Sequence, residues 1–303
     1  METSAANAGP MSAEPANALF AGGHGRSLLA LTWRQFRTNR GALAGLTVLL
    51  LLVLLAFCAP LAAPYDPTAP STLHLRPPQS AHLMGTDVFG RDILARVIWG
   101  SRISLVIGLV SVSIAAGCGM VLGLLAGFYR GAPDAVIMMM MDIMLAFPGI
   151  LLALSIIAML GPSLRNVMIA VGISSVPVYT RVVRGGVLSA RESAYIEAAR
   201  VIGCRNRRVM FLHLLPNVIT PVIVLSTLSV ATAILTAAGL SFLGLGAQPP
   251  TPEWGAMVSD GRQYLRTAWW VSTGPGLIIM LTVLAINQVG DGLRDALDPR
   301  LRL

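Results

Sequence analysis

The sequence contains no lysine, and all 22 of its basic residues are arginine. A P-loop binds nucleotide phosphates with a lysine, and a Schiff-base mechanism uses a lysine amine, so both kinds of site are excluded. We therefore expect the energy for any work by this protein to come from another chain or from an ion gradient.

Charged residues are also scarce. Only 12% of the 303 residues are charged, whereas 55% are hydrophobic, and the mean hydropathy is +0.72. Roughly a quarter of the residues of a soluble domain are charged, so these values exclude that class. The net charge of +8 does not indicate nucleic-acid binding, because no basic stripe with interleaved aromatic residues accompanies it.

Cysteine occurs only three times, at Cys58, Cys118 and Cys204, without a CxxC pair. The spacing indicates neither a disulfide framework nor a metal site. We expect three small, buried apolar side chains, and no metal or other cofactor.

Long apolar runs predict an all-α membrane protein with six transmembrane helices. The first covers residues 41–63 and follows a polar segment whose first 25 residues have the composition of a disordered tail. No apolar stretch lies close enough to Met1 to be a secretory signal. The further predicted spans are Ile103–Phe128, Ala135–Leu160, Val167–Val187, Val218–Leu245 and Val271–Gly290.

The arginines predict the orientation, because cytoplasmic loops carry an excess of positive charge. With the N-terminus inside, the inner segments hold fifteen arginines and the outer loops hold seven. We therefore expect residues 1–40 and 291–303 to be cytoplasmic tails. Residues 64–102 then form a long external loop, and a second external loop contains Trp254, Trp269 and Trp270, which we expect at the headgroup level.

The inner loop of residues 189–217 has the signals of a short helix. Ser189 followed by Glu192 is a capping-box pattern, which predicts the start of the helix, and Gly203 is placed for the left-handed residue that ends it. A second, basic helical segment is expected over Arg205–Leu215, with its end at Pro216.

One face of this short helix has small side chains. Helical spacing places Ala198, Ala199 and Ile202 on one face with Tyr195. Such a face leaves room for the surface of another protein to approach closely.

Glu197, Ala198 and Ala199, followed by Gly203 and by Leu215-Pro216, resemble the EAA loop in permease subunits of binding-protein-dependent ABC importers. In that family the loop forms a short cytoplasmic helix that docks into a cleft of the ATPase subunit. The resemblance implies that Glu197, Ala198, Ala199 and Gly203 form an ATPase-docking loop.

Other motifs are similar to those of the dipeptide, oligopeptide and nickel permeases. They are Gly85-Thr86-Asp87 with Gly90-Arg91-Asp92, the stretch Leu240–Gly246, and the stretch Gly290–Arg300. The resemblance runs from Gly41 to Arg302 and points to the second, C-type permease of a dipeptide importer. Glutathione importers are the next most similar group.

This resemblance implies an ABC importer type I-like permease fold with a core of residues 103–290. The chain would have no catalytic residues and would sit in a bacterial inner membrane. Its expected partners are a second permease subunit in a heterodimer, two ABC ATPase subunits, a periplasmic solute-binding protein and membrane lipid, but no nucleic acid.

Two other classes of membrane protein, an intramembrane enzyme and a secondary transporter, would have different sequence features. An intramembrane enzyme would need a motif such as HExxH or GxSG, and the sequence contains neither. A self-powered secondary transporter is the alternative that stays open. It would be expected to show inverted repeats and more paired charges within its spans.

Asp142 is the one acidic residue well inside a predicted span. A charge at that depth costs roughly 2.5–3.5 kcal/mol, so it faces water or a partner. One interpretation is a contact to the translocation cavity or to a moving helix junction. The other is a structural ion pair with Arg130 or with another arginine of the inner segments.

Two further patterns occur within the spans. In the second span, small residues recur every four positions, which predicts close helix packing. They are Ser111, Ala115, Gly119, Gly123 and Gly127.

In the fifth span, Ser229, Thr232 and Thr236 share one helical face. This face suits a cavity through which peptides pass. The equally weighted alternative is that the hydroxyls bond to preceding carbonyls of their own helix.

Overall fold

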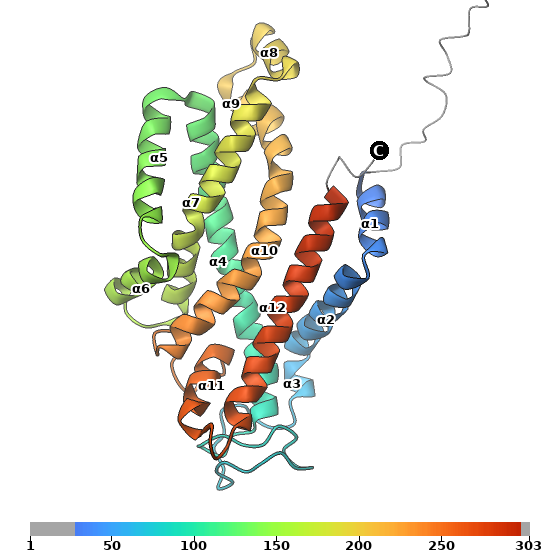
Figure 1. The fold of residues 1–303 in the computed structure, drawn as a ribbon, viewed down its shortest axis with the longest axis vertical. Coiled ribbons are helices and arrows are strands. Elements are labelled where there is room, and N and C mark those ends of the chain that lie inside the picture. The colour runs from blue at the N-terminus through green and yellow to red at the C-terminus, as the bar shows by residue number, and fades with distance from the viewer. Residues whose placement is uncertain (1–27, 298–303) are drawn as a thin grey trace, which may run out of the picture.

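The computed structural model describes residues 28–297 and is a bundle of long helices that run between two ends (Figure 1). The N-terminal half contains α1 (Leu28–Thr38), α2 (Arg40–Phe57), α3 (Ala59–Ala62), α4 (Ile93–Tyr129), α5 (Gly131–Leu145) and α6 (Gly149–Leu160). The C-terminal half contains α7 (Leu164–Arg191), α8 (Ala194–Val201), α9 (Asn206–Arg208), a π-helical segment (Val209–Leu214), α10 (Leu215–Phe242), α11 (Trp254–Gly261), a 3₁₀ turn (Arg262–Tyr264) and α12 (Trp270–Leu297).

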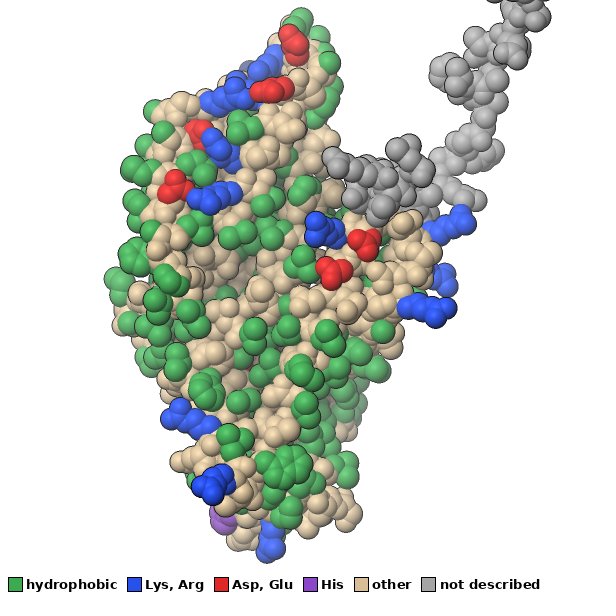
Figure 2. All heavy atoms as spheres, in the orientation of Figure 1, with side chains coloured by type: hydrophobic (Ala, Val, Ile, Leu, Met, Phe, Trp, Pro, Cys, Tyr) green, Lys and Arg blue, Asp and Glu red, His purple; other side chains and the backbone are tan. Residues whose placement is uncertain are grey.

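Five helices in residues 28–297 are long and apolar enough to cross a membrane, and a bent pair brings the number of spans to six. The five are Arg40–Phe57, Ile93–Tyr129, Leu164–Arg191, Asn206–Phe242 and Trp270–Leu297. On the face drawn in Figure 2, charged side chains gather toward the two ends, with a band of apolar and small side chains between them. This distribution fits a protein that crosses a membrane along its long axis.

The bent pair corrects the prediction of one continuous span over residues 135–160. Helices α5 and α6 meet at an angle of 93°. The break lies at Phe147-Pro148, where the proline ring disfavours helical geometry in the residue before it. Most side chains of both helices are exposed, and Met141, Ala153 and Ile157 are the buried ones.

The largest helix contact joins α4 to α7, and the predicted ladder of small residues forms it. All five ladder residues are buried. A Cβ atom added to Gly119 would lie 2.3 Å from the Tyr179 Cβ, and one added to Gly127 would lie 2.8 Å from the Val187 Cβ. The prediction of close packing is therefore confirmed, and the packing partner is a helix of the same chain.

The two ends of the bundle differ in what they carry. Helix α1, the end of α12 and the short helix α8 lie at one end, whereas α3, the segment of residues 63–92 and α11 lie at the other (Figure 1). Helix α4 begins at Ile93, ten residues before the predicted span, so the external loop is shorter than 64–102. The expected disordered tail of residues 1–25 lies outside the described residues.

The prediction that the three cysteines are buried is wrong. Cys118 is exposed, and Cys58 and Cys204 are half-buried. Cys118 stands next to Gly117, where an added Cβ would meet no atom within 4 Å, so this face of α4 is open. A membrane protein can place small apolar side chains on its exterior, because lipid tails are as apolar as its core.

Substitution of alanine at two glycines of α4 tests the helix contact. We expect Gly119→Ala to lower the free energy of unfolding by about 1–3 kcal/mol, because the added methyl overlaps Tyr179. Gly117→Ala is the matched control on the open face and should be neutral or slightly stabilising, by up to about 1 kcal/mol. Thermal unfolding in detergent measures both, and equal stability of the two variants would contradict the packing argument.

Candidate functional site

Helix α8 is the predicted short helix, but it begins later than the sequence pattern suggests. Helix α7 continues through Ser189 to Arg191, and Ser193 is the residue before α8. The capping-box prediction at Ser189 is therefore wrong. Helix α7 continues past Ser189 because Val183 and Val187 pack against glycines of α4, and this packing outweighs the local capping signal.

The end of α8 is confirmed at Gly203, which has φ +80°. The N–H of Cys204 donates to the Ala199 carbonyl at 3.0 Å, and the N–H of Gly203 donates to the Arg200 carbonyl at 2.9 Å. This pair of bonds is a Schellman motif, and glycine adopts its left-handed conformation without a steric cost. The helix therefore ends sharply and projects as a short, defined element.

Two faces of α8 have different environments. Ile196 and Ala199 are buried against the bundle, so the prediction that Ala199 belongs to the open face is wrong. Tyr195, Ala198 and Ile202 share the outward face, and Ile202 is 78% exposed. The carboxylate of Glu197 is also on the exposed surface. The Tyr195 hydroxyl accepts from Asn217 Nδ2 at 2.9 Å, and the remaining exposed apolar surface of this face suits protein docking.

The sequence pattern predicted that the helical segment after α8 ends at Pro216. This prediction is wrong, because the helix continues through that residue. Residues Asn206–Phe242 run on as one long helix through the π-helical segment. Pro216 lies inside this helix, just after the π-helical segment, and the helix continues past it. Helix α8 is thus followed closely by a helix that extends to the opposite end of the bundle (Figure 1).

Two ion pairs join α5 to α7. Asp142 accepts from Arg181 Nη2 at 2.6 Å, and both oxygens of Asp134 accept from Arg184, at 2.6 and 2.7 Å. The side chains of Asp142 and Arg181 are 58% and 51% exposed. Asp142 is therefore paired, and the pair stands on a surface that this chain leaves open.

The hydroxyl groups of α10 do not join Asp142 in one cluster. Thr232 donates to the Ser229 carbonyl of its own helix at 2.9 Å. Thr232 is exposed, whereas Ser229 and Thr236 are half-buried. Both interpretations thus have support here, because the Thr232 hydroxyl bonds within the helix and its side chain also lies on an open surface.

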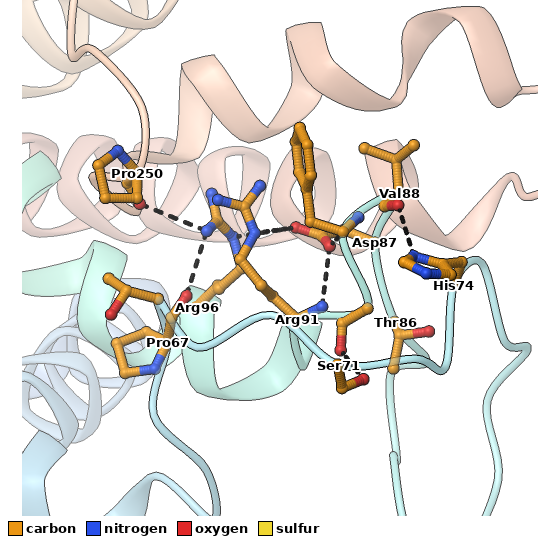
Figure 3. Close-up of polar contacts among 12 residues, drawn as sticks. Pro67, Ser71, His74, Thr86, Asp87, Val88, Arg91, Arg96 and Pro250 are labelled. Carbon is orange, nitrogen blue, oxygen red and sulfur yellow. Dashed lines mark hydrogen bonds and ion pairs between the residues drawn. The ribbon is translucent and has the colours of Figure 1, made fainter.

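At the other end of the bundle, the segment Gly85–Asp92 folds around the carboxylate of Asp87 (Figure 3). This carboxylate accepts from the N–H of Phe89 at 2.8 Å, from the N–H of Arg91 at 2.9 Å and from Arg91 Nε at 2.6 Å. Gly85 and Gly90 have φ +77° and +74° in the turns that flank it. The sequence motif therefore encodes a loop with a defined conformation.

Arg96 joins this loop to other loops at the same end of the bundle. The side chain is buried, with its Nε 3.7 Å from Asp87 Oδ2. Its Nη1 donates to the carbonyls of Pro67 and Pro250, which come from two different loops (Figure 3). Burial raises the pKa of Asp260 nearby, and the charge of Arg96 opposes that shift.

Glu253 and Trp254 secure α11 beneath this network. The Glu253 carboxylate accepts from the N–H groups of Gly255 and Ala256, at 2.9 Å each, and burial raises its pKa. Trp254 is fully buried, and its Nε1 donates to the Val97 carbonyl at 3.0 Å. The prediction of an interfacial ring is therefore wrong for Trp254, because Gly100 of α4 leaves the space that the indole fills.

Sequence reasoning missed Arg96 and Asp260 as members of this network. Arg96 was counted only as an outer positive charge, although it stands one turn after the motif residues Arg91 and Asp92. That spacing places it on the same side of the helix start as Asp92, which was the available signal.

Two family models match the chain. Residues 119–303 match the model described as binding-protein-dependent transport system inner membrane component, and residues 27–78 match the N-terminal TM domain of oligopeptide transport permease C.

Named relatives match over most of their length. The chain is 51% identical to the di/tripeptide transport system permease protein DppC of Pseudomonas aeruginosa, over 89% of this chain and 91% of that protein. It is 45% identical to the glutathione transport system permease protein GsiD of Pectobacterium atrosepticum, over 89% of this chain and 90% of that protein.

A solved structure of the MetNI methionine ABC transporter, in an inward-facing conformation, has the same fold. The TM-score is 0.56 at 19% identity, over 68% of this chain and 98% of that one. An ABC importer permease fold is thus shown for the bundle.

Removal of the Asp87 charge tests the external network. We expect Asp87→Asn to lower the free energy of unfolding by about 3 kcal/mol or more, because two buried arginines lose their shared carboxylate. The matched control is Asp66→Asn, on an exposed aspartate of the same segment, which should change stability little. Limited proteolysis of residues 63–92 and thermal unfolding report the result, and an intact Asp87→Asn loop would contradict it.

Proposed function

Because this chain belongs to the family of binding-protein-dependent transport system inner membrane components, we propose that it is one of two permease subunits of an importer for dipeptides and oligopeptides. Membership of the family makes it a multi-pass inner-membrane permease of an ATP-driven importer, with a binding protein and separate ATPase subunits as partners. The peptide substrate is supported by the names of the relatives, and glutathione is the nearby alternative.

The observation that carries the coupling proposal is the open apolar face of α8. We propose that Tyr195, Ala198 and Ile202 enter a cleft of the ATPase subunit, with Glu197 at the edge and Gly203 ending the docked helix. Ala198 is small, so the partner can approach the helix backbone closely.

The buried face of α8 connects the helix to the rest of the bundle. Through this face, a movement of the docked ATPase subunit would be transmitted to the membrane-spanning helices. Ile196 belongs to one buried apolar cluster with Val187 of α7 and with Val209, Met210 and Leu214 of the π-helical segment. Motion of α8 would therefore move α7 and α10 together. Switching such a two-state permease nearly to completion takes a preference of about 5.5 kcal/mol from the ATP-bound partner.

The translocation path is proposed on the surface that carries the exposed polar groups of the spans. Asp142, Arg181 and Thr232 are exposed in this chain, and lipid tails would not solvate the charges of Asp142 and Arg181. A second permease subunit covering this surface would enclose them in a water-filled path. Ser229 and Thr236 of α10 lie on the same stretch of helix and complete the proposed lining.

The proposed orientation places α8 and both chain ends in the cytoplasm and the Asp87 network outside. The excess of arginine on the α8 side supports it. Helix α1 and the end of α12 lie at the same end as α8, as an even number of crossings requires (Figure 1). The external surface would then receive the solute-binding protein.

Docking is tested by a charge on the open face of α8. Ile202→Glu should weaken co-purification of the ATPase subunits by about ten-fold, because an exposed side chain that becomes buried on docking would carry a charge. ATP-dependent dipeptide uptake by reconstituted complexes should fall with it. Leu265→Glu, the same change on an exposed leucine at the opposite end, is the matched control and should retain the ATPases.

Retained docking and uptake in Ile202→Glu would remove α8 as the docking element. Dipeptide uptake by the chain alone, driven by a proton gradient without ATPase subunits, would instead favour a secondary transporter.

The role of Asp142 is tested by a double-mutant cycle with Arg181. Asp142→Asn should slow peptide uptake, and the exchange Asp142→Arg with Arg181→Asp should restore part of it, with a coupling of about 1 kcal/mol. Asp295→Asn, at an exposed aspartate of α12, is the control. If Asp142→Asn changes only thermal stability and not uptake, the ion pair is structural and Asp142 does not line the path.

A further inference from the structure

An apolar groove lies between α2 and α4 on the outside of the bundle. It has a volume of about 330 Å³ and lies toward the end of the bundle that carries the Asp87 network. Its lining residues are Val53, Ala56 and Phe57 of α2 with Arg102, Leu105, Val106 and Leu109 of α4. The α4 residues stand at helical spacing, so they form one stripe of about 10 Å along the helix.

Arg102 stands at the end of this stripe that is nearer to the start of α4. Its side chain is exposed, and no ion pair joins it to an acidic side chain within residues 28–297. The guanidinium carbon lies 5.3 Å from the centre of the Trp99 ring, which holds it beside the helix. The groove thus combines an apolar floor with a cation at one end.

The depth of Arg102 corresponds to the edge of the hydrocarbon. Helix α4 has 37 residues, or about 56 Å, whereas the hydrocarbon core of a bilayer is about 30 Å thick. An equal overhang at the two ends places the boundary about 13 Å from Ile93, which is the position of Arg102. Trp99 then lies one turn further out, at the headgroup level where tryptophan is enriched.

We propose that this groove is a binding site for a phospholipid of the leaflet on the side of the Asp87 network. One acyl chain lies along Val53, Val106 and Leu109, and the headgroup phosphate pairs with Arg102. Charge complementarity selects this occupant, because a phosphate above an acyl chain matches a cation above an apolar floor.

A second groove in the structure is also apolar but has no charged residue in its lining, and it therefore serves as a comparison for the role of Arg102. It lies between α2, α4 and α12, has about 240 Å³, and is lined by residues such as Leu52, Leu94 and Leu277. Its only hydroxyl-bearing lining residue is Ser101, and none of its lining residues is charged. It can hold an acyl chain but offers no partner for a phosphate.

The test uses the full chain in vesicles of phosphatidylethanolamine and phosphatidylglycerol, with a phosphatidylglycerol that carries a photoactivatable group in its acyl chain. Mapping of the cross-linked peptides should place labels on Phe57, Val106 and Leu109. Arg102→Gln should reduce this labelling about five-fold, as expected for one arginine near a membrane surface. Leu109→Trp should abolish it by filling the groove.

Two controls match these variants. Arg165→Gln removes another exposed arginine, and Val121→Trp adds an indole at another exposed site of α4, so both should leave the labelling unchanged. Labelling that spreads evenly along α2 and α4, or that survives Arg102→Gln, overturns the proposal. A cross-link to a segment of a partner subunit in place of lipid overturns it as well. Arg102 is exposed, so its variant remains informative even if Leu109→Trp fails to fold.

Discussion

The close approach of α4 and α7 is the contact on which the remaining arrangement depends. Gly119, Gly123 and Gly127 of α4 leave no room for a Cβ, and the side chains of Tyr179, Val183 and Val187 fill the space beside them. No hydrophobic force joins helices within a bilayer, so the gain comes from packing at short distance. Because of this contact, α7 continues past Ser189, where the capping-box pattern predicted the start of the next helix, and α8 begins later, at Ala194.

The helices differ in the interactions that hold them in the bundle. Helices α4, α7 and α10 share one buried apolar cluster that includes Ile196 of α8, so the proposed docking element belongs to the tightly packed part. Helix α5 has a single buried side chain and is joined to α7 by the ion pairs of Asp134 and Asp142. Ion pairs that are partly open to solvent separate at a lower cost than interlocked side chains do. Helix α5 is therefore held less tightly than α6, whose Ala153 and Ile157 lie in the same buried cluster as α4, α7 and α10.

The end of the bundle opposite α8 is organised by a buried carboxylate instead of by apolar packing. Asp87 satisfies two backbone N–H groups and faces Arg91 and Arg96, and Arg96 extends the network to carbonyls of two loops. A loop fixed in this way has one defined conformation at this end of the bundle. Toward the same end, Arg102 lines the apolar groove between α2 and α4.

The sequence by itself determined the class, the family and the position of most of the long apolar helices. Hydropathy predicts the spans because a helix that crosses lipid must be long and apolar. The small-residue ladder and Gly203 are also readable from the sequence, because close helix packing needs small side chains and a left-handed helix end favours glycine. Tertiary structure decided what depends on neighbours. It gave Asp142 the partner Arg181, turned Ala199 toward the bundle and buried Trp254 against Gly100. These outcomes depend on contacts between residues far apart in the chain, which a local pattern does not encode.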